Sequence, residues 1–326
     1  MSIKYVNDIQ LNADLKSIAD AIRTKGSTSA SLSFPTGFIS AIETIPTGGG
    51  GNTNEFGIID KTISGTYSNS ENTIIGSNAF CYCSQIQSVV FENATSIYGN
   101  AFFTCSSLKT ASFPVCTRIG TNAFELCSSL TEVSFPELEH ILGSKAFAVC
   151  SSLSYVNFPK CRSIGVSAFA ECVGLLSADF SYSSAVTIAS YAFMSCFSLK
   201  NVNIPNLINV EYQAFYKCSS LESACFSKVG SIYSSAFGYC YNLSIASFPL
   251  CSNIRSNAFA YCSSLATVYF PSCQTINGSA FTYCQMLESV SFPSCNIIYG
   301  NAFAGCSNLK TVYFPICSSM YSLVFT

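Results

Sequence analysis

The chain repeats one phrase of about 22 residues along most of its length. Ala-Phe pairs recur eleven times, from Ala79-Phe80 to Ala302-Phe303, and the step is 22 residues except for one of 23 and one of 24. A degenerate twelfth copy is Val324-Phe325. A unit this short cannot bury its own apolar side chains, so its copies must stack on one another. The repeat therefore predicts a solenoid of 11 to 12 coils rather than separate globular domains.

Apolar residues occupy fixed positions in every copy, numbered here from the Phe of each Ala-Phe pair. Position +6 is Leu or Ile, +9 is Val or Ala, +11 is Phe except for one Ile, +12 is usually Pro, and +17 is mostly Ile. The alternation over +9 to +11 predicts a short strand that Pro ends, and the Ile segment predicts a second strand. The spacing Ala-Phe-x-x-Cys-x-x-Leu predicts a single helical turn. We therefore expect an α/β solenoid.

Cysteine fills two further positions of the repeat. Position +3 is Cys in all eleven copies, and position +14 is Cys in six copies and Ala, Leu or Val in four others. This exchange set indicates small buried apolar sites, because a free thiol behaves as a small hydrophobe. Disulfides and metal binding are the alternatives. Stacked coils would place column neighbours about 4.8 Å apart, but a column of eleven is odd and its members point the same way. The Cys81-x-Cys83 pair lacks a zinc spacing, so buried reduced thiols are favoured.

Composition limits the function classes. Charged residues make up 10% of the chain and the net charge is −2, which disfavours nucleic acid as a partner. No apolar run is long enough to span a membrane, and the N-terminus does not resemble a signal peptide. We therefore expect no membrane insertion, synthesis in a cytoplasm and mostly reduced thiols. The single histidine, His140, has no recurring acidic partner, and the TGGGGN stretch lacks the Lys of a phosphate loop. No catalytic residues, metal site or cofactor are predicted, and we expect the protein not to be an enzyme.

The repeat resembles a known family. Leu265-x-x-Val268-x-Phe270-x-x-Cys273 is similar to the leucine-rich repeat pattern L-x-x-L-x-L-x-x-N/C. The phrase SIG-x-x-AF-x-x-CSSL-x-x-V-x-F-P resembles the BspA-like leucine-rich repeats of bacteria and some protists, over about residues 58–326. The resemblance implies a leucine-rich repeat solenoid.

Residues 1–46 do not repeat and predict a small helical module. One helix is expected in LNADLKSIADAIRTKGS and a second in FPTGFISAIETI, followed by a Gly-rich linker over 47–54 and the solenoid over 55–326. The pattern at Leu15–Arg23, Lys25, Gly26 and Phe34–Ile42 resembles a module in tail and other virion-associated proteins of phages and prophages of Gram-positive bacteria. The resemblance implies that residues 1–46 bind a phage structural protein and that the chain resides in the virion. The alternative is a plain N-terminal cap.

The strand positions +8 and +10 are expected to face solvent, where solenoids bind partners. They are rich in Tyr, Ser and Asn, which suit adaptable recognition of a bacterial surface protein or glycan. The candidate ligand-binding residues are Tyr155, Asn157, Asp179, Asn201, Asn203, Tyr269 and Tyr313. At position +2, Tyr239, Tyr261 and Tyr283 follow one another in three successive copies and are expected to stack as an aromatic strip. The alternative is that these are ordinary solvated residues.

These observations favour a phage tail or virion-associated adhesin that contacts the bacterial surface through the solenoid. The alternatives are an intracellular protein–protein interaction scaffold and a bacterial surface adhesin. The apolar repeat continues up to Thr326, so we also expect the end of the solenoid to be covered by homo-oligomer contacts or by further residues.

Overall fold

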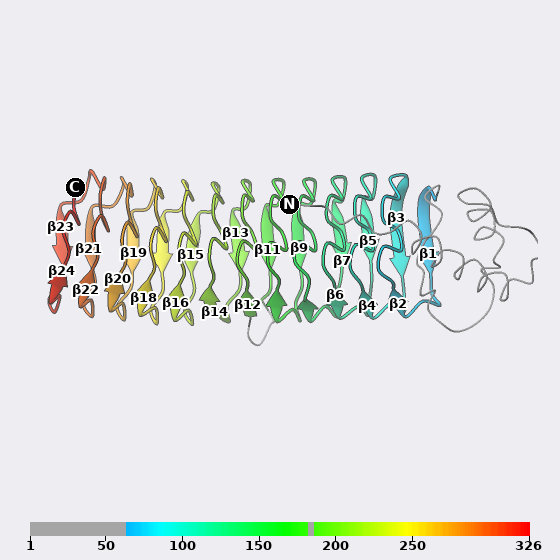
Figure 1. The fold of residues 1–326 in the computed structure, drawn as a ribbon, viewed down its shortest axis with the longest axis horizontal. Helices are drawn as coiled ribbons and strands as arrows, with labels where there is room; N and C mark the ends of the chain where they lie inside the picture. Colours follow the sequence, from blue (N-terminus) through cyan, green and yellow to red (C-terminus); the bar gives the residue numbers. More distant parts are fainter. Residues whose placement is uncertain (1–62, 182–185) are drawn as a thin grey trace, which may run out of the picture. The chain divides into compact units, whose positions relative to one another are not determined.

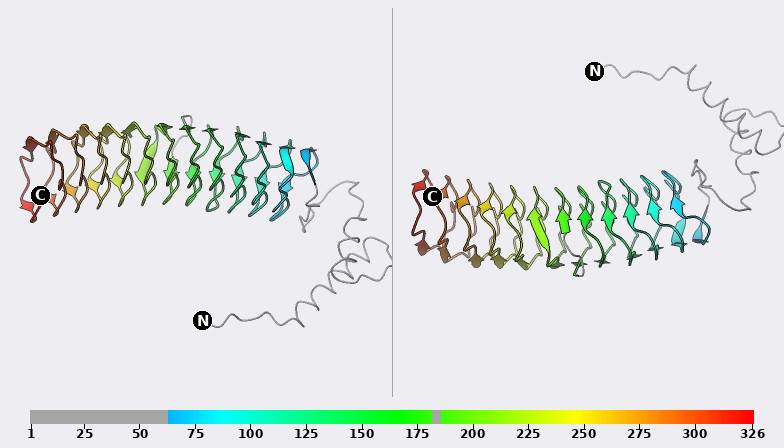
Figure 2. Two further views of the ribbon diagram at one scale, coloured as in Figure 1. Left: turned by 90° about the horizontal axis from the view of Figure 1, so that it is seen from above. Right: turned by 90° about the horizontal axis from the view of Figure 1, so that it is seen from below.

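A computed structural model describes residues 63–181 and 186–326. The chain divides into two units, Met1–Asn52 and Thr53–Thr326, and all described residues belong to the second. The two helices predicted within residues 1–46 and the Gly-rich linker over 47–54 lie outside the described residues. The described part is a solenoid whose coils follow one another in chain order along a single axis (Figures 1 and 2).

Each coil contributes two short parallel strands, one to each of two faces of the rod. The first face, called the odd face, carries β1 (Gly65–Asn69), β3 (Ile86–Phe91), β5 (Thr110–Ser112), β7 (Glu132–Ser134), β9 (Tyr155–Asn157), β11 (Ser177–Asp179), β13 (Asn201–Asn203), β15 (Ser223–Cys225), β17 (Ile245–Ser247), β19 (Thr267–Tyr269), β21 (Ser289–Ser291) and β23 (Thr311–Tyr313).

The second face, called the even face, carries β2 (Ile74–Ile75), β4 (Ser96–Ile97), β6 (Arg118–Ile119), β8 (His140–Ile141), β10 (Ser163–Ile164), β12 (Val186–Ile188), β14 (Leu207–Val210), β16 (Ser231–Ile232), β18 (Asn253–Ile254), β20 (Thr275–Ile276), β22 (Ile297–Ile298) and β24 (Ser319–Met320). These twelve strands form one continuous sheet in chain order. The structure thus confirms a solenoid of about 22-residue coils with both predicted strands in each coil.

The predicted helical turn is wrong, and backbone conformation explains why. Positions −2 and +2 have positive φ in coil after coil, for example Asn122 at 54° and Leu126 at 64°. A right-handed helix cannot continue through such residues. The N–H groups of Phe124 and Leu126 instead donate to Ala146 and Ala148 of the next coil, at 2.7 and 3.0 Å. The segment is therefore a stack of turns, and the described residues form strands and turns without a helix.

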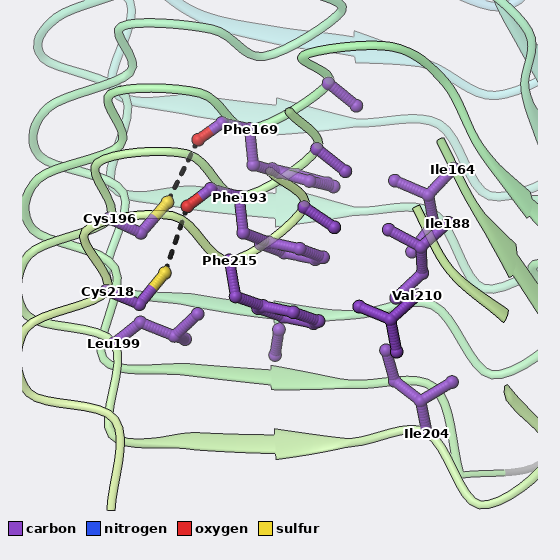
Figure 3. Close-up of a cluster of buried hydrophobic side chains, with 14 of the residues drawn as sticks. Ile164, Phe169, Ile188, Phe193, Cys196, Leu199, Ile204, Val210, Phe215 and Cys218 are labelled. Atoms are coloured by element: carbon purple, nitrogen blue, oxygen red, sulfur yellow. Dashed lines mark hydrogen bonds between the residues drawn. The ribbon is translucent and has the colours of Figure 1, made fainter. Parts of the chain in front are cut away.

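Two ladders of phenylalanine rings fill the interior. The rings of the Ala-Phe pairs stack from coil to coil, as with Phe193 and Phe215, whose centroids lie 5.3 Å apart with planes at 1° (Figure 3). The rings at position +11 form a second ladder, which Ile204 interrupts once, as with Phe248 and Phe270 at 5.3 Å. Up to Phe303 both ladders are buried, together with the Leu at +6 and the Ile at +17. Burial of such side chains stabilises a coil only when its neighbours are in place.

Most of the cysteine thiols are buried, as the sequence predicted. Of the nineteen, fifteen are buried and none forms a disulfide. At position +3 the thiols of the ten copies from Cys105 to Cys306 also donate to the carbonyl oxygen of a Phe one coil earlier, as with Cys218 and Phe193 at 3.1 Å (Figure 3). At position +14 the thiol instead donates to a carbonyl two residues later in its own coil, as with Cys251 and Asn253 at 3.4 Å. The two columns therefore differ in their bonding as well as in their sequence.

Candidate binding face

The structure places the predicted ligand-binding residues on the odd face. Tyr155 and Asn157 lie on β9, Asp179 on β11, and Asn201 and Asn203 on β13. All five belong to one three-stranded sheet, β9–β11–β13. The other two predicted residues are exposed on more distant strands, Tyr269 on β19 and Tyr313 on β23. The strand register thus brings five of the predicted residues together, in a region called here the central patch.

Two rows of side chains cross the central patch along the rod axis. Tyr155, Ser177 and Asn201 are register partners in one row, and Asn157, Asp179 and Asn203 in the other. The Asp179 carboxylate accepts hydrogen bonds from the Asn203 side-chain amide at 3.1 Å and from the Ser181 backbone N–H at 3.0 Å.

These bonds hold the row in place, and Asp179 is the one charged side chain among the six residues of the two rows. Hydroxyl and amide groups at coil spacing suit an uncharged polar ligand that extends along the rod.

The odd face is interrupted in three places, whereas the even face is continuous. Its sheet breaks between β7 and β9, between β13 and β15, and between β19 and β21. The strand before each break carries a +9 valine that is only partly buried: Val133, Val202 and Val268. The +9 residues of the strands within each sheet are buried instead, for example Ala111, Val156 and Ala224. The breaks therefore open the edge of the core to the odd face.

Shallow clefts lie at two of these breaks and flank the central patch. The first has a volume of about 460 Å³ and is lined by Thr110, Ala111, Ser112, Thr131, Glu132, Val133, Ser134, Ser154 and Tyr155. The second has a volume of about 290 Å³ and is lined by Val202, Asn203, Ile204, Pro205, Cys225, Phe226, Ser227, Ser247 and Pro249. Only Glu132 among these residues carries a charge. The sequence analysis missed the clefts. Each break nevertheless lies after a coil whose +9 residue is Val and whose preceding coil has Ala at +9.

The predicted aromatic strip is present on a different side, in the stack of turns. Tyr239 and Tyr261 stack with centroids 4.6 Å apart, and Tyr261 and Tyr283 with centroids 4.9 Å apart. Tyr216 packs edge-on against Tyr239 at 5.3 Å. Because the rings cover one another's faces, the strip presents mainly ring edges and hydroxyl groups to solvent.

Titratable groups elsewhere form no further site in the described residues. His140 contacts Ser163 through Nδ1 at 2.9 Å and lies 3.9 Å from Glu139. Burial raises the pKa of the Cys161 thiol to about 12 and that of Cys251 to about 11, which disfavours the reactive thiolate. Within residues 63–181 and 186–326 no group of His, Cys, Asp and Glu side chains is arranged to hold a metal ion. The same residues contain no helix that could cross a membrane.

The last coil leaves apolar side chains uncovered. Val312 at position +9 is exposed, whereas the +9 side chains of all earlier coils are buried or half-buried.

The chain matches a family model described as "BspA type Leucine rich repeat region (6 copies)" over residues 60–176 and 162–287. A search among curated proteins finds no match. A solved leucine-rich repeat protein from Bacteroides ovatus is similar over 83% of this chain and 88% of its own, with 22% identity and a TM-score of 0.49.

A leucine-rich cell surface protein from Faecalibacterium prausnitzii matches 75% of this chain and 83% of its own, with 21% identity and a TM-score of 0.42. The pneumococcal vaccine antigen PcpA matches 80% of this chain and 76% of its own, with 15% identity and a TM-score of 0.43.

Proposed function

Because the chain belongs to the BspA-type leucine-rich repeat family, we propose that it is a non-enzymatic adhesin that recognises a bacterial surface ligand through the odd face. The observation that carries the proposal is the central patch, where five exposed or half-exposed polar side chains lie on three adjacent strands between two clefts. Rigid parallel strands hold these groups at fixed spacing, which lowers the entropic cost of binding.

The first experiment measures binding of the purified chain to intact Gram-positive cells and to their isolated walls. Replacement of both Tyr155 and Asn203 by Ala in one variant should reduce binding, because both side chains belong to the central patch and each lines a cleft. The control is Ile208→Ala on β14, an exposed position of the even face. Equal binding by the unchanged chain, the Tyr155 and Asn203 variant and Ile208→Ala would show that the odd face does not bind the ligand.

The proposal assigns residues 1–46 to attachment of the adhesin to a phage particle. Its support is the sequence pattern at Leu15–Arg23 and Phe34–Ile42 alone, and these residues lie outside the described part of the structure. The test is co-purification of the full chain with phage tail proteins encoded near its gene. Retention by the full chain, and loss on deletion of residues 1–46, is the expected result. If the full chain retains no tail protein, attachment to a phage particle is contradicted, and the proposal is reduced to an adhesin without a role in the virion.

An intracellular scaffold and a bacterial surface adhesin without a virion remain as second candidates. Fifteen buried cysteines without a disulfide suit a chain that folds in a reducing compartment, which favours the scaffold. Binding to a cytoplasmic protein through the central patch, with no binding to walls, would select it. Display of the chain on cells that carry no phage would select the surface adhesin.

A further inference from the structure

The three breaks in the odd face recur at one interval. They follow β7, β13 and β19, so successive breaks are three coils apart. With neighbouring parallel strands about 4.8 Å apart, this interval corresponds to about 14 Å along the rod. Each break exposes part of a +9 valine, namely Val133, Val202 and Val268. The odd face thus presents the same local feature three times along one line.

The surface between the breaks is polar and nearly uncharged. From the first cleft to the second, a ligand would cross Tyr155, Asn157, Asp179, Asn201 and Asn203 before it reached Ser247. No Lys or Arg lines either cleft. A polymer of phosphate or carboxylate groups would therefore lose its hydration there without gaining a cationic partner.

We infer that the odd face binds one uncharged linear polysaccharide that runs along the rod axis and occupies successive breaks. The inference rests on the proposed function and specifies the ligand of the same face. Sugar rings carry both apolar C–H faces and hydroxyl groups. The clefts offer partly buried apolar floors, and the central patch offers hydroxyl and amide partners. A ligand that repeats along its length matches a surface that repeats along its length, since each further break engaged adds to the affinity without a new kind of contact.

The structure supplies its own reporter for this binding. Cys225 is the one exposed thiol among the nineteen cysteines, and it lines the second cleft beside its register partner Ser247. A polysaccharide seated in that cleft should shield Cys225 from iodoacetamide. The rate of Cys225 alkylation, followed by mass spectrometry on the full chain, therefore reports occupancy of a single cleft.

The probes are uncharged linear oligosaccharides, namely chito- and cello-oligosaccharides of two to eight residues and a neutral wall polysaccharide from Gram-positive cells. Lipoteichoic acid serves as the charged comparison. We expect affinity to rise at least about tenfold once the oligomer is long enough to span two breaks. We also expect the longer oligomers to slow Cys225 alkylation at concentrations at which the disaccharide does not.

Two variants close the clefts while leaving the coils intact. Ser134→Arg and Ser247→Arg each add bulk and charge to one cleft, and each should lower the affinity for the longest binding oligomer about tenfold or more. Ile208→Arg on β14 is the matched control on the even face and should change affinity less than twofold. Circular dichroism and the Cys225 alkylation rate of Ser134→Arg without ligand verify that the coils are folded.

The outcomes separate this inference from the proposed function. Wall binding that is lost in Tyr155→Ala, with no binding to any uncharged glycan, would overturn the polysaccharide and leave a surface adhesin with a protein or charged ligand. Glycan binding that ignores oligomer length, or that persists in both Arg variants, would overturn occupancy of successive breaks. If the chain binds neither cell walls nor any glycan, both the proposed function and this inference are contradicted.

Discussion

The thiol of Cys196 donates a hydrogen bond to the carbonyl oxygen of Phe169, one coil earlier, over 3.1 Å (Figure 3). The same oxygen accepts the backbone N–H of Cys172 at 3.2 Å. In an apolar interior a carbonyl gains from a second donor, because no water is present to supply one. The thiol is both small and able to donate, which explains why position +3 holds Cys in every full copy whereas position +14 accepts Ala, Leu or Val.

We predict that the two cysteine columns differ in their sensitivity to substitution. Cys218→Ala removes a donor to Phe193 and leaves a small cavity, so it should lower the free energy of unfolding by about 1–2 kcal/mol. Cys251→Ala should cost less, about 1 kcal/mol or below, because its column already holds Ala94 in another coil. Urea unfolding followed by circular dichroism compares the two. Equal losses would contradict a special role for position +3.

Native thiol reactivity should single out one cysteine. Cys225 is exposed, three others are half-buried, and the rest are buried. A brief treatment of the folded chain with iodoacetamide should therefore modify Cys225 first, and the buried columns only after denaturant is added. Peptide mapping by mass spectrometry gives the order. Rapid modification of Cys218 or Cys262 in the folded chain would be incompatible with a closed core.

Much of the solenoid could be predicted from the positions of residues in the repeat. The features that could not be predicted have physical causes. The inward and outward positions of the strands were predictable, because a +9 side chain such as Ala178 must point opposite to its neighbours Ser177 and Asp179. The turn at Phe124 was not, since the spacing of apolar residues does not reveal that Asn122 and Leu126 adopt positive φ. The clefts escaped prediction because, although the change from Ala111 to Val133 at position +9 is visible in the sequence, whether it separates two strands depends on how Val133 packs against its neighbours.

The positive φ at position +2 gives a stabilising substitution. Val149 has a φ of 60°, a conformation that costs a β-branched residue more than most. Val149→Gly should raise the free energy of unfolding by up to about 1 kcal/mol, although the loss of a half-buried side chain offsets part of the gain. Val173→Gly is the control, since Val173 lies in the next coil with a negative φ, and it should destabilise. Urea midpoints measured side by side test the pair, and destabilisation by both changes would show that packing outweighs backbone strain.

Alkaline pH should unfold the solenoid through its thiols. Burial raises the pKa of Cys116 and Cys161 to about 12, and that of Cys251 to about 11, above the ordinary value of 9.0. Between pH 9 and these values the unfolded chain has lost protons that the folded chain keeps. The free energy of unfolding therefore falls as pH rises, by about 1.4 kcal/mol per pH unit for each such thiol. Below about pH 8 the thiols are protonated in both states and contribute no slope.

The measurement is urea unfolding at pH 8, 9, 10 and 10.5 in the presence of a reductant. Cys251→Ala removes one titrating group, so the decline between pH 9.5 and 10.5 should become shallower by the contribution of one thiol. This difference assigns the slope to buried thiols rather than to tyrosine or lysine, whose numbers the variant leaves unchanged. A free energy of unfolding that stays constant up to pH 10.5 would mean that the thiols ionise in the folded chain at the same pH as in the unfolded chain, and it would contradict the raised pKa values.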